Sequence, residues 1–547
     1  MARCSSLVPS AFETALRILP ASHQVRLSHV VDGVASGFSM GPLTMPSRTY
    51  VAPNHFKAEQ LPVVEKWREK ALEEGWACGP FTKEEIENVA GPFVSIPLTI
   101  VHTPATTTKP EKNRVCFNAS WSPHSSVGPG FSGIPESINK EVKDEPWECE
   151  WFLLEEVKVL LSGASSTARV MGYDLADAYQ QVPNLPAQRR RFVFAVAGQF
   201  FVWVVGMFGI ATMSAVFGQL CDVSCAWLEH QFPSLRARHF ADDHMVLHDG
   251  ELGQPPPAEA DVYASVSRFG WKVHATKRFG WTRPFTLLGF EWDLDAGTVA
   301  LTEEKRDKYL RKLSAFLQPK QVNYRQTSSV LGTLVHTCAI FSERRSHLNA
   351  LYALRSRFDR SFPWHSLALS TAAHAEVREW LGFLQTPSLA RSFHIPTTSY
   401  EHTLYSDASD LGCGVVMDGR ARFWPLPGAI DNDDVDIGVM EAWALHLALQ
   451  ACVAAGAKEC VVQFAVDNMG VVYAMRKGRS RSRWTNRCLA SIAELASGRN
   501  ITMSVSYIAS ADNPADAPSR GDCSLFAPLE FDWAAPWQGV LGAALYP

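Results

Sequence analysis

The sequence predicts an α+β fold followed by a separate α/β domain. Residues 91–300 alternate short apolar runs with turn-rich pieces, residues 301–400 carry helical periodicity, and residues 401–521 return to an alternating helix and strand pattern. Residues 1–90 give no clear pattern, and the apolar tail, residues 522–547, is expected to pack against the rest of the chain. At 547 residues the chain has room for three or four domains of about 150 residues each.

The composition is that of an ordinary globular protein, with 46% hydrophobic and 20% charged residues. The formal net charge is −5, so a nucleic-acid partner has to be argued from local patches. The 12 cysteines are scattered without zinc-finger spacing, and the nearest approach to such a motif is the pair Cys221 and Cys225. We expect reduced thiols in an intracellular location, cytoplasmic with the nucleus as an alternative, because the N-terminus lacks the apolar core of a secretory signal.

One segment, residues 192–220, carries no charged residue and is long enough to suggest a membrane span. Its glycines, its internal Gln199 and its β-branched and aromatic run FFVWVV fit a buried hairpin followed by a helix at least as well. Nothing else in the chain is expected to be comparably apolar. A membrane protein is therefore the weaker alternative.

Two neighbouring aspartates, Asp242 and Asp243, stand in the stretch FADDHMVL, which predicts a hairpin that turns at the aspartate pair. A plain exposed turn is the simplest interpretation of such a short motif. A third aspartate, Asp174, closes the apolar strand ARVMGYD upstream. Carboxylates that end separate strands can converge on two divalent ions, which offset their repulsion and clamp the oxygens of a phosphoryl transfer.

A series of motifs surrounds these aspartates in a definite order. DLADAY is followed by GMFGIATMSAVF, FADD, GWKVHATK and LLGFEWD, and KNRVCFNASWSPHSSVGPGFSGIP precedes them. This order resembles the fingers and palm of retroelement reverse transcriptases, and the upstream motif resembles the variant of DIRS-like elements that encode a tyrosine recombinase. The resemblance implies a right-hand polymerase, with fingers and palm over residues 91–300 and a helical thumb or connection over residues 301–400.

The resemblance implies roles for individual palm residues. Asp177 and Ala178 match the positions whose backbone amides face the triphosphate of the incoming nucleotide. Tyr179 matches the ring that excludes a 2′-hydroxyl, which implies deoxynucleotide substrates, with a plain core tyrosine as the alternative. The residues that match the metal-binding carboxylates are Asp174, Asp242 and Asp243.

Other motif positions imply contacts with substrate and primer. Arg114 matches a fingers arginine that contacts the triphosphate, and Lys112 or Lys109 supplies a second cation unless these lysines belong to a solvated turn. Lys277 matches a lysine that protonates the leaving pyrophosphate, with an ordinary surface lysine as the alternative. The chain departs from the family at Met213–Ser214, where Ala-Pro is usual. Phe208 and Gly209 match a turn that faces the nucleotide in this family. Leu288, Gly289 and Phe290 match the turn that contacts the primer, the primer grip.

A second set of acids is spread over the C-terminal pattern. Asp407 lies on the strand TLYSDAS, Glu441 in the first turn of the helix GVMEAWALHLALQACV, and Asp467 at the end of the buried strand CVVQFAVDN. Asp516 lies near a helix start in ADNPADAPSRG. This order resembles a retroelement ribonuclease H over residues 401–521, and it implies four ligands for two ions that cleave the RNA of a hybrid. A histidine that the family often carries before the last aspartate is absent.

A basic cluster, MRKGRSRSRW, lies between Asp467 and Asp516. Such a run neutralises phosphates and makes binding salt-dependent, with a solvated charged face as the alternative. The run RRR at residues 189–191 is a weaker signal of the same kind, and the acidic DNDDVD at residues 431–436 is expected to be a solvated loop. The basic residues of the cluster are Arg476, Lys477, Arg479, Arg481 and Arg483.

Two functional hypotheses follow from these patterns. The first is an enzyme that copies RNA and DNA templates into DNA from dNTPs and cleaves the RNA of RNA–DNA hybrids, with two Mg²⁺ ions at each site and Mn²⁺ as the alternative ion. Its partners would be an RNA template, a DNA primer and a hybrid, with no membrane. The second is a catalytically silent, domesticated nucleic-acid-binding protein of the same fold, which the intact set of acids argues against. The natural primer, the oligomeric state and the role of residues 1–90 are left open.

Overall fold

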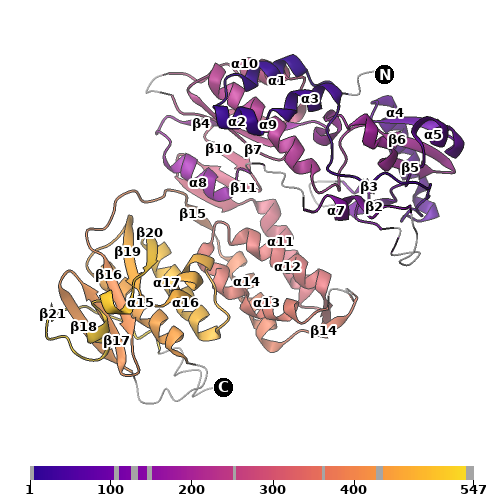
Figure 1. The fold of residues 1–547 in the computed structure, drawn as a ribbon. Helices are drawn as coiled ribbons and strands as arrows, with labels where there is room; N and C mark the ends of the chain where they lie inside the picture. Colours follow the sequence, from indigo (N-terminus) through magenta and orange to yellow (C-terminus); the bar gives the residue numbers. More distant parts are fainter. Residues whose placement is uncertain are drawn as a thin grey trace. The chain divides into compact units, whose positions relative to one another are not determined.

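The computed structural model divides the chain into two compact units (Figure 1). Unit 1 comprises Met1–Leu153 and Ala164–Leu288, and unit 2 comprises Leu154–Gly163 and Gly289–Pro547. The residues that the structure describes are 5–103, 110–122, 124, 133–144, 149, 151–250, 254–359, 362, 364–387, 389–426 and 435–537.

Unit 1 mixes helices with three antiparallel sheets. Its strands are β1 (Ala77–Phe81), β2 (Leu98–Thr103), β3 (Lys112–Phe117), β4 (Arg169–Leu175), β5 (Val193–Val196), β6 (Gln199–Trp203), β7 (Leu235–Phe240), β8 (Asp243–His248), β9 (Val273–Thr282) and β10 (Pro284–Leu287). Its helices are α1 (Pro9–Leu16), α2 (Ala21–Arg26), α3 (His29–Ser36), α4 (Leu61–Glu73), α5 (Lys83–Ala90), α7 (Ile138–Glu141), α9 (Met213–Gln231) and α10 (Glu259–Ser267), with 3₁₀ segments η1 (Ala58–Gln60), η2 (Ala178–Gln181) and η3 (Pro186–Arg191). The sheets have the orders β7-β8-β4-β9, β1-β6-β5 and β2-β3.

The N-terminal helices belong to the main core of unit 1. Phe12 on α1 packs edge-on against Phe269 and Trp271, with ring centroids 4.8 and 6.2 Å away. Strand β1 extends the sheet of β5 and β6 by pairing antiparallel with β6. Residues 1–90, which show no pattern in the sequence, therefore share a core with the motif-bearing segments.

The uncharged segment 192–220 forms a hairpin and the start of a helix, as predicted. Strands β5 and β6 are joined at Ala197 and Gly198, which have φ values of 50° and 79°. Two consecutive residues with positive φ form the turn that matches the twist of a tight hairpin. Helix α9 then begins at Met213, and most of its side chains are buried in the core.

Unit 2 contains a helical part, short antiparallel strand pairs and one mixed sheet. Its helices are α8 (Leu154–Ser162), α11 (Glu303–Phe316), α12 (Tyr324–Thr337), α13 (Asn349–Ser356), α14 (Thr371–Gln385), α15 (Ile437–Ala454), α16 (Met469–Lys477), α17 (Arg483–Gly498) and α18 (Asp516–Ser519), with 3₁₀ segments η4 (Ser342–Leu348) and η5 (Ser510–Asp512). Its strands are β11 (Phe290–Asp293), β12 (Thr298–Leu301), β13 (Gln321–Asn323), β14 (Ser366–Ala368), β15 (Ala390–Ser392), β16 (Leu404–Ala408), β17 (Gly412–Met417), β18 (Arg420–Pro425), β19 (Cys460–Val466), β20 (Ile501–Tyr507) and β21 (Ala527–Pro528). The predicted helix after residue 301 is α11, which is capped by the side chain of Thr302.

A six-stranded sheet organises the C-terminal part of unit 2 in the order β20-β19-β16-β17-β18-β21. Strands β16, β17 and β18 are antiparallel, whereas β19 and β20 run parallel to β16. Helix α15 packs on β16 and β17 (Figure 1). The predicted packing of the tail is confirmed for its described part, because β21 pairs with β18 and Trp533 contacts Trp424.

One helix in the described part of the chain, α15, is long and apolar enough to cross a membrane by length and composition. The expectation that no segment other than 192–220 would be comparably apolar is therefore wrong. In the structure, 67% of this helix is buried inside the protein. A helix that is apolar all round is typical of a position between a sheet and further helices, which is where α15 lies.

Candidate functional site

The paired aspartates lie at the tip of the β7–β8 hairpin. The turn consists of Ala241 and Asp242, and Asp243 is already the first residue of β8, paired with Phe240. The predicted turn at Asp242 and Asp243 is thus wrong by one residue. Ala241 takes the left-handed conformation, with φ 51°, that the first position of a tight hairpin turn requires.

Strand β4 brings Asp174 to the same place. Asp174 is the cross-strand partner of Asp243 in the antiparallel pairing of β4 with β8. The backbone N–H of Leu175 donates to the carbonyl oxygen of Asp242 at 3.2 Å, which ties the end of β4 to the turn. Three acids from two distant segments therefore meet at one end of the four-stranded sheet.

Lys277 on β9 is the cation of this acidic group. Its Nζ lies 2.9 Å from Asp174 Oδ2, and this hydrogen bond raises the pKa of Lys277. The pKa of Asp242 is also raised, first by burial and then by the negative charge of Asp174, while Lys277 opposes the shift. Because Lys277 is more than half exposed, its ion pair contributes little to stability and leaves Asp174 open to a competing cation.

Asp174, Asp242 and Asp243 lie farther apart than the ligands of a preformed metal site. Among the described residues, two clusters bring potential ligand atoms of three residues within 4.8 Å of one another, and Asp174, Asp242 and Asp243 form neither of them. Oxygen donors of this type nevertheless suit hard cations such as Mg²⁺. Burial and, after it, the charge of Asp174 keep the pKa of Asp242 raised, and Lys277 only partly opposes this shift.

The aromatic residues predicted to face the nucleotide pack together. The Tyr179 ring lies 4.6 Å from the exposed ring of Phe208 and 5.4 Å from Phe217. Burial, followed by the charge of Asp242, raises the pKa of Tyr179. Ala178 is buried beside it, and Asp177 is exposed with a left-handed φ of 49° and an ion pair to Lys70 at 3.7 Å. The turn that carries Phe208 therefore lies against the DLADAY motif.

The predicted nucleotide-facing turn is fixed by a residue that the sequence did not indicate. Asn139 donates from Nδ2 to the carbonyl of Gly209 at 2.7 Å and accepts from the N–H of Ala211 at 2.9 Å. Gly209 has φ 97°, and a Cβ there would lie 3.0 Å from the carbonyl oxygen of Phe117. Gly209 therefore allows the close approach of this turn to the end of β3.

The predicted fingers cations lie on β3. Lys112 and Arg114 are both exposed and, as alternate residues of one strand, they point to the same face of the β2–β3 ribbon. Within the described residues, no hydrogen bond or ion pair joins either side chain to the three aspartates. Lys109 lies outside the described residues.

The predicted primer-grip residues form a tight turn between β10 and β11. Leu288 and Gly289 both have positive φ, 53° and 80°. The Phe290 ring is buried and stacks on His336 with centroids 4.4 Å apart, so its side chain is unavailable to a nucleic acid. A Cβ at Gly289 would collide with the side chain of Lys305. The backbone of the turn and the half-buried side chain of Leu288 are therefore the parts of this motif that a ligand could reach.

The second acidic group is a compact cluster in unit 2. Asp407 on β16, Glu441 on α15 and Asp467 at the end of β19 place one carboxylate oxygen each within 4.8 Å of the others. Asp407 and Glu441 are both 4% exposed. Because β16 and β19 are parallel neighbours, Asp407 and Asp467 end adjacent strands at the same edge of the sheet. Glu441 is the fifth residue of α15, so its predicted place in the first turn is wrong by one residue.

Burial and mutual repulsion hold protons on this cluster in the absence of a cation. Burial, together with the charges of Asp407 and Asp467, raises the pKa of Glu441 to about 9. Burial and the neighbouring acids raise the pKa of Asp407 to about 6. Glu441 Oε2 and Asp467 Oδ1 are buried without a hydrogen-bond partner. Such oxygens fit a divalent cation, which would supply the missing partner and offset the charge.

Asp516 is near this cluster but is engaged elsewhere. Arg520 donates to both of its carboxylate oxygens, at 3.0 and 3.4 Å. The charge of Asp516 still contributes to the raised pKa of Asp407. Its segment is docked on the sheet, since Asn513 Nδ2 donates to the carbonyl of Ser406 at 3.2 Å and a Cβ at Gly414 would collide with the backbone of Ser519. Arg520 and Gly414 were not indicated by the sequence.

The basic cluster spans the end of α16 and the start of α17. Arg476, Lys477 and Arg481 are exposed. Arg479 instead stacks on the ring of Tyr352 at 4.3 Å, and Arg483 lies over Trp484 at 4.5 Å. Arg483 is nevertheless exposed, so only Arg479 is half-buried in packing, and the other four cations of the cluster can meet phosphates.

The acidic stretch 431–436 is described only in part, because residues 431–434 lie outside the described residues. Asp436 is exposed, as predicted, but it also caps helix α15 by accepting from the N–H of Val439 at 3.0 Å. A carboxylate at this position satisfies a free amide and interacts favourably with the helix dipole. Asp436 therefore fixes the start of the helix that carries Glu441.

The raised pKa values predict a stability that depends on pH and on metal. The folded chain keeps its proton on Glu441 up to about pH 9, whereas the unfolded chain loses it near 4.5. The contribution of Glu441 protonation to the stability of the fold is therefore complete below pH 4.5 and is lost as the pH rises through 9. The thermal unfolding midpoint, measured in a chelator, should fall over this range. Adding Mg²⁺ at the alkaline end should restore the midpoint. Scanning calorimetry of the parent and of Glu441→Gln checks this, because the unfolding midpoint of the variant should change less with pH. Equal changes of the midpoint with pH in both proteins would contradict the prediction.

Comparisons with known proteins assign no family. No family model matches the chain, and no curated protein matches it. Among solved structures, the chain is similar to the foamy viral protease-reverse transcriptase in complex with an RNA/DNA hybrid, with 14% identity and a TM-score of 0.47 over 91% of this chain and 62% of that one. The same viral protein in complex with double-stranded DNA has 14% identity and a TM-score of 0.45 over 92% of this chain and 97% of that one. The chain thus spans less than two thirds of the first of these structures.

Proposed function

We propose that the chain is a reverse transcriptase that joins RNA- and DNA-templated DNA polymerisation to ribonuclease H cleavage of RNA–DNA hybrids. One observation carries the proposal: carboxylates that are distant in sequence meet twice, once in each compact unit. Two divalent ions held by such groups activate a nucleophile and stabilise a leaving oxygen in phosphoryl transfer. The order of the motifs around both sites supports this chemistry over an unrelated metal site.

In the polymerase site, Asp174, Asp242 and Asp243 would hold the ions. Lys277 lies 2.9 Å from Asp174, where it can move onto the departing pyrophosphate once a metal takes its place. The rings of Tyr179 and Phe208 pack together beside Asp242. This aromatic surface supports contact with the sugar of the nucleotide and a preference for dNTPs. Arg114 and Lys112 would neutralise the triphosphate from the β2–β3 ribbon.

In the ribonuclease site, Asp407, Glu441 and Asp467 would hold the ions, and Asp516 would join them by exchanging its contact with Arg520. The buried carboxylates then orient a water against the scissile phosphate of the RNA strand. Arg476, Lys477 and Arg481 would neutralise the backbone of the hybrid, which makes binding weaker as salt increases. Mg²⁺ is the proposed ion, with Mn²⁺ as a substitute.

Both activities can be tested on the full chain with an RNA template, a labelled DNA primer, dNTPs and Mg²⁺. We expect extended primers, followed by shortening of the template RNA wherever a hybrid has formed. A chelator should stop both reactions, because each depends on carboxylate-bound cations. A chain that binds the hybrid but neither extends the primer nor cleaves the RNA would instead support the silent binding protein.

A further inference from the structure

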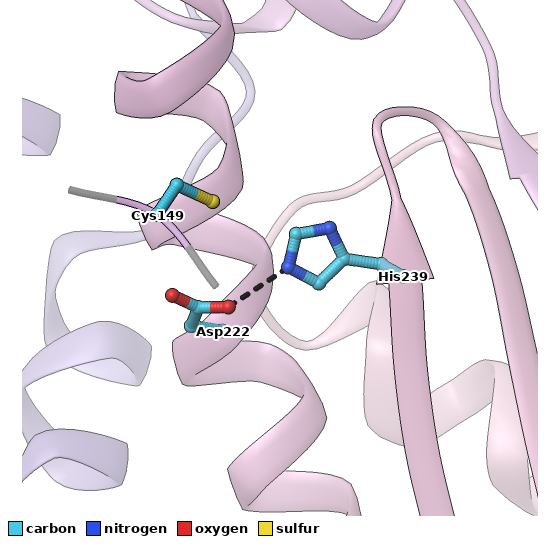
Figure 2. Close-up of side chains that lie close together, drawn as sticks. All are labelled: Cys149, Asp222 and His239. Atoms are coloured by element: carbon cyan, nitrogen blue, oxygen red, sulfur yellow. Dashed lines mark hydrogen bonds and ion pairs between the residues drawn. The ribbon is translucent and has the colours of Figure 1, made fainter. Parts of the chain in front are cut away.

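A third cluster of potential metal ligands lies in unit 1, outside both acidic sites. Cys149, Asp222 on α9 and His239 on β7 place a thiol sulfur, a carboxylate oxygen and an imidazole nitrogen within 4.8 Å of one another (Figure 2). Figure 2 shows the three side chains pointing toward a common space, with His239 Nε2 and Asp222 Oδ1 2.9 Å apart. The cluster joins Cys149 to two residues, Asp222 and His239, that lie 17 positions apart on the consecutive elements α9 and β7.

The polar atoms of this cluster are not fully satisfied by the protein. Asp222 Oδ2 and His239 Nδ1 are buried without a hydrogen-bond partner, and the His239 side chain is only 3% exposed. Arg26 approaches Asp222 Oδ2 at 3.8 Å, which is an ion pair beyond hydrogen-bonding distance. Asp222 Oδ2 therefore has a positive charge nearby but no hydrogen-bond donor, which leaves room for a cation at closer range.

The backbone holds Cys149 in place from two sides. A Cβ at Gly218 would collide with Cys149 Sγ, so the glycine leaves a hollow on α9 one turn before Asp222. On the other side, the N–H of Phe152 donates to the carbonyl of His239 at 3.3 Å, and the Trp151 ring packs edge-on against His239. The hollow at Gly218 and the contacts of Trp151 and Phe152 with His239 therefore place the segment of Cys149 beside the other two groups.

From this geometry we infer that Cys149, Asp222 and His239 form a binding site for a zinc-class transition metal ion. A thiolate and an imidazole prefer Zn²⁺ to Mg²⁺, so this ion differs from those of the acidic sites. Tetrahedral ligands at about 2.0–2.3 Å from Zn²⁺ lie roughly 3.3–3.8 Å from one another, which the cluster reaches by small side-chain shifts. Water would complete the fourth position. The Cys149 thiol releases its proton to solvent when the metal binds, and the imidazole proton of His239 shifts from the ligating nitrogen to the other ring nitrogen.

The position of the site suggests what it does. His239 is followed by Phe240, the last residue of β7, and then by the turn that carries Asp242. The ring of His239 also stacks on His244 of β8, with centroids 5.6 Å apart. An ion bound here would fix β7 to α9 and to Cys149, next to the turn of the hairpin that carries Asp242 and Asp243. Asp222, His239 and Cys149 are thus positioning residues for that hairpin.

The test uses Co²⁺ as a spectroscopic probe on the full chain, first stripped with a chelator. We expect one equivalent of Co²⁺ to give tetrahedral d–d bands and a thiolate-to-cobalt charge-transfer band, and Zn²⁺ to abolish both while excess Mg²⁺ does not. Cys149→Ser should remove the charge-transfer band, and His239→Ala should weaken binding by more than about 100-fold. The charge-transfer band requires a thiolate, so ions bound at the carboxylate sites cannot produce it.

The matched control is Cys225→Ser, which changes a buried thiol on α9 about one turn beyond Asp222, whereas Cys149 is half-buried and lies outside that helix. This variant should keep the bands and the affinity of the parent. Circular dichroism of each variant separates loss of the site from loss of the fold. Absence of a charge-transfer band in the parent, or its survival in folded Cys149→Ser, would overturn the inference and leave the His239–Asp222 contact as a plain ion pair.

Discussion

Replacing Asp242 with asparagine is expected to abolish primer extension while hybrid cleavage continues at the parental rate. The substitution keeps the shape of the side chain but removes one of three negative charges that meet at the end of β4 and the β7–β8 turn. Metal-ion stabilisation of a phosphoryl transfer amounts to several kcal/mol, and each 1.36 kcal/mol is a factor of ten in rate. The expected loss is therefore on the order of 10³-fold or more.

Single-turnover extension of a labelled primer measures this loss, and cleavage of a preformed hybrid is followed with the same preparation. Asp261→Asn is the matched control, because Asp261 is an exposed aspartate of unit 1 in the first turn of α10, away from the palm acids. The control should extend primers like the parent. If Asp242→Asn also extended them normally, the polymerase site would have to lie elsewhere in the chain.

The hairpin and the meeting of its aspartates with Asp174 could be anticipated from the sequence. Apolar runs that end in aspartates show where strands stop, and strands that stop at one edge bring their last residues together. The position of the turn could not be anticipated, because it depends on Ala241 accepting a left-handed backbone. Alanine is an unusual residue for that conformation, whereas aspartate is a common one.

The partners of the predicted acids could not be read from the sequence. Lys277 was expected to act on a leaving group, and the structure adds its contact with Asp174. Arg520 is part of the motif ADNPADAPSRG, yet nothing in the spacing indicates that it holds Asp516 rather than nucleic acid. Such contacts depend on tertiary packing, which determines which of several reachable charges a side chain meets.

The Cys149, Asp222 and His239 cluster was missed for a different reason. Known zinc motifs place cysteine and histidine ligands at short, regular spacings, and these three residues are spread over about ninety positions. The only local hint is Gly218 within the long helix α9, because glycine in a helix interior is costly unless close packing requires it.

Replacing Asp407 with asparagine is expected to have the opposite effect on the two activities. RNA in a hybrid should remain uncleaved, while primer extension is unchanged. Asp407 is 4% exposed and shares its cluster with Glu441 and Asp467, so loss of its charge should weaken cation binding directly. The rate of RNA cleavage should fall by about 10³-fold or more, on the same grounds of metal-ion stabilisation. Gel analysis of labelled RNA in a hybrid, with extension measured in parallel, checks both outcomes.

Stability separates a catalytic role of Asp407 from a structural one. Because the neighbouring acids and burial raise the pKa of Asp407 to about 6, its charge at neutral pH opposes folding in the absence of a cation. Asp407→Asn should therefore unfold at the same or a higher temperature than the parent in a chelator, although it is inactive. Asp418→Asn, an exposed aspartate in the β17–β18 turn, should leave both properties unchanged. An inactive Asp407→Asn that also unfolds at a lower temperature would mean that Asp407 supports the fold rather than the chemistry.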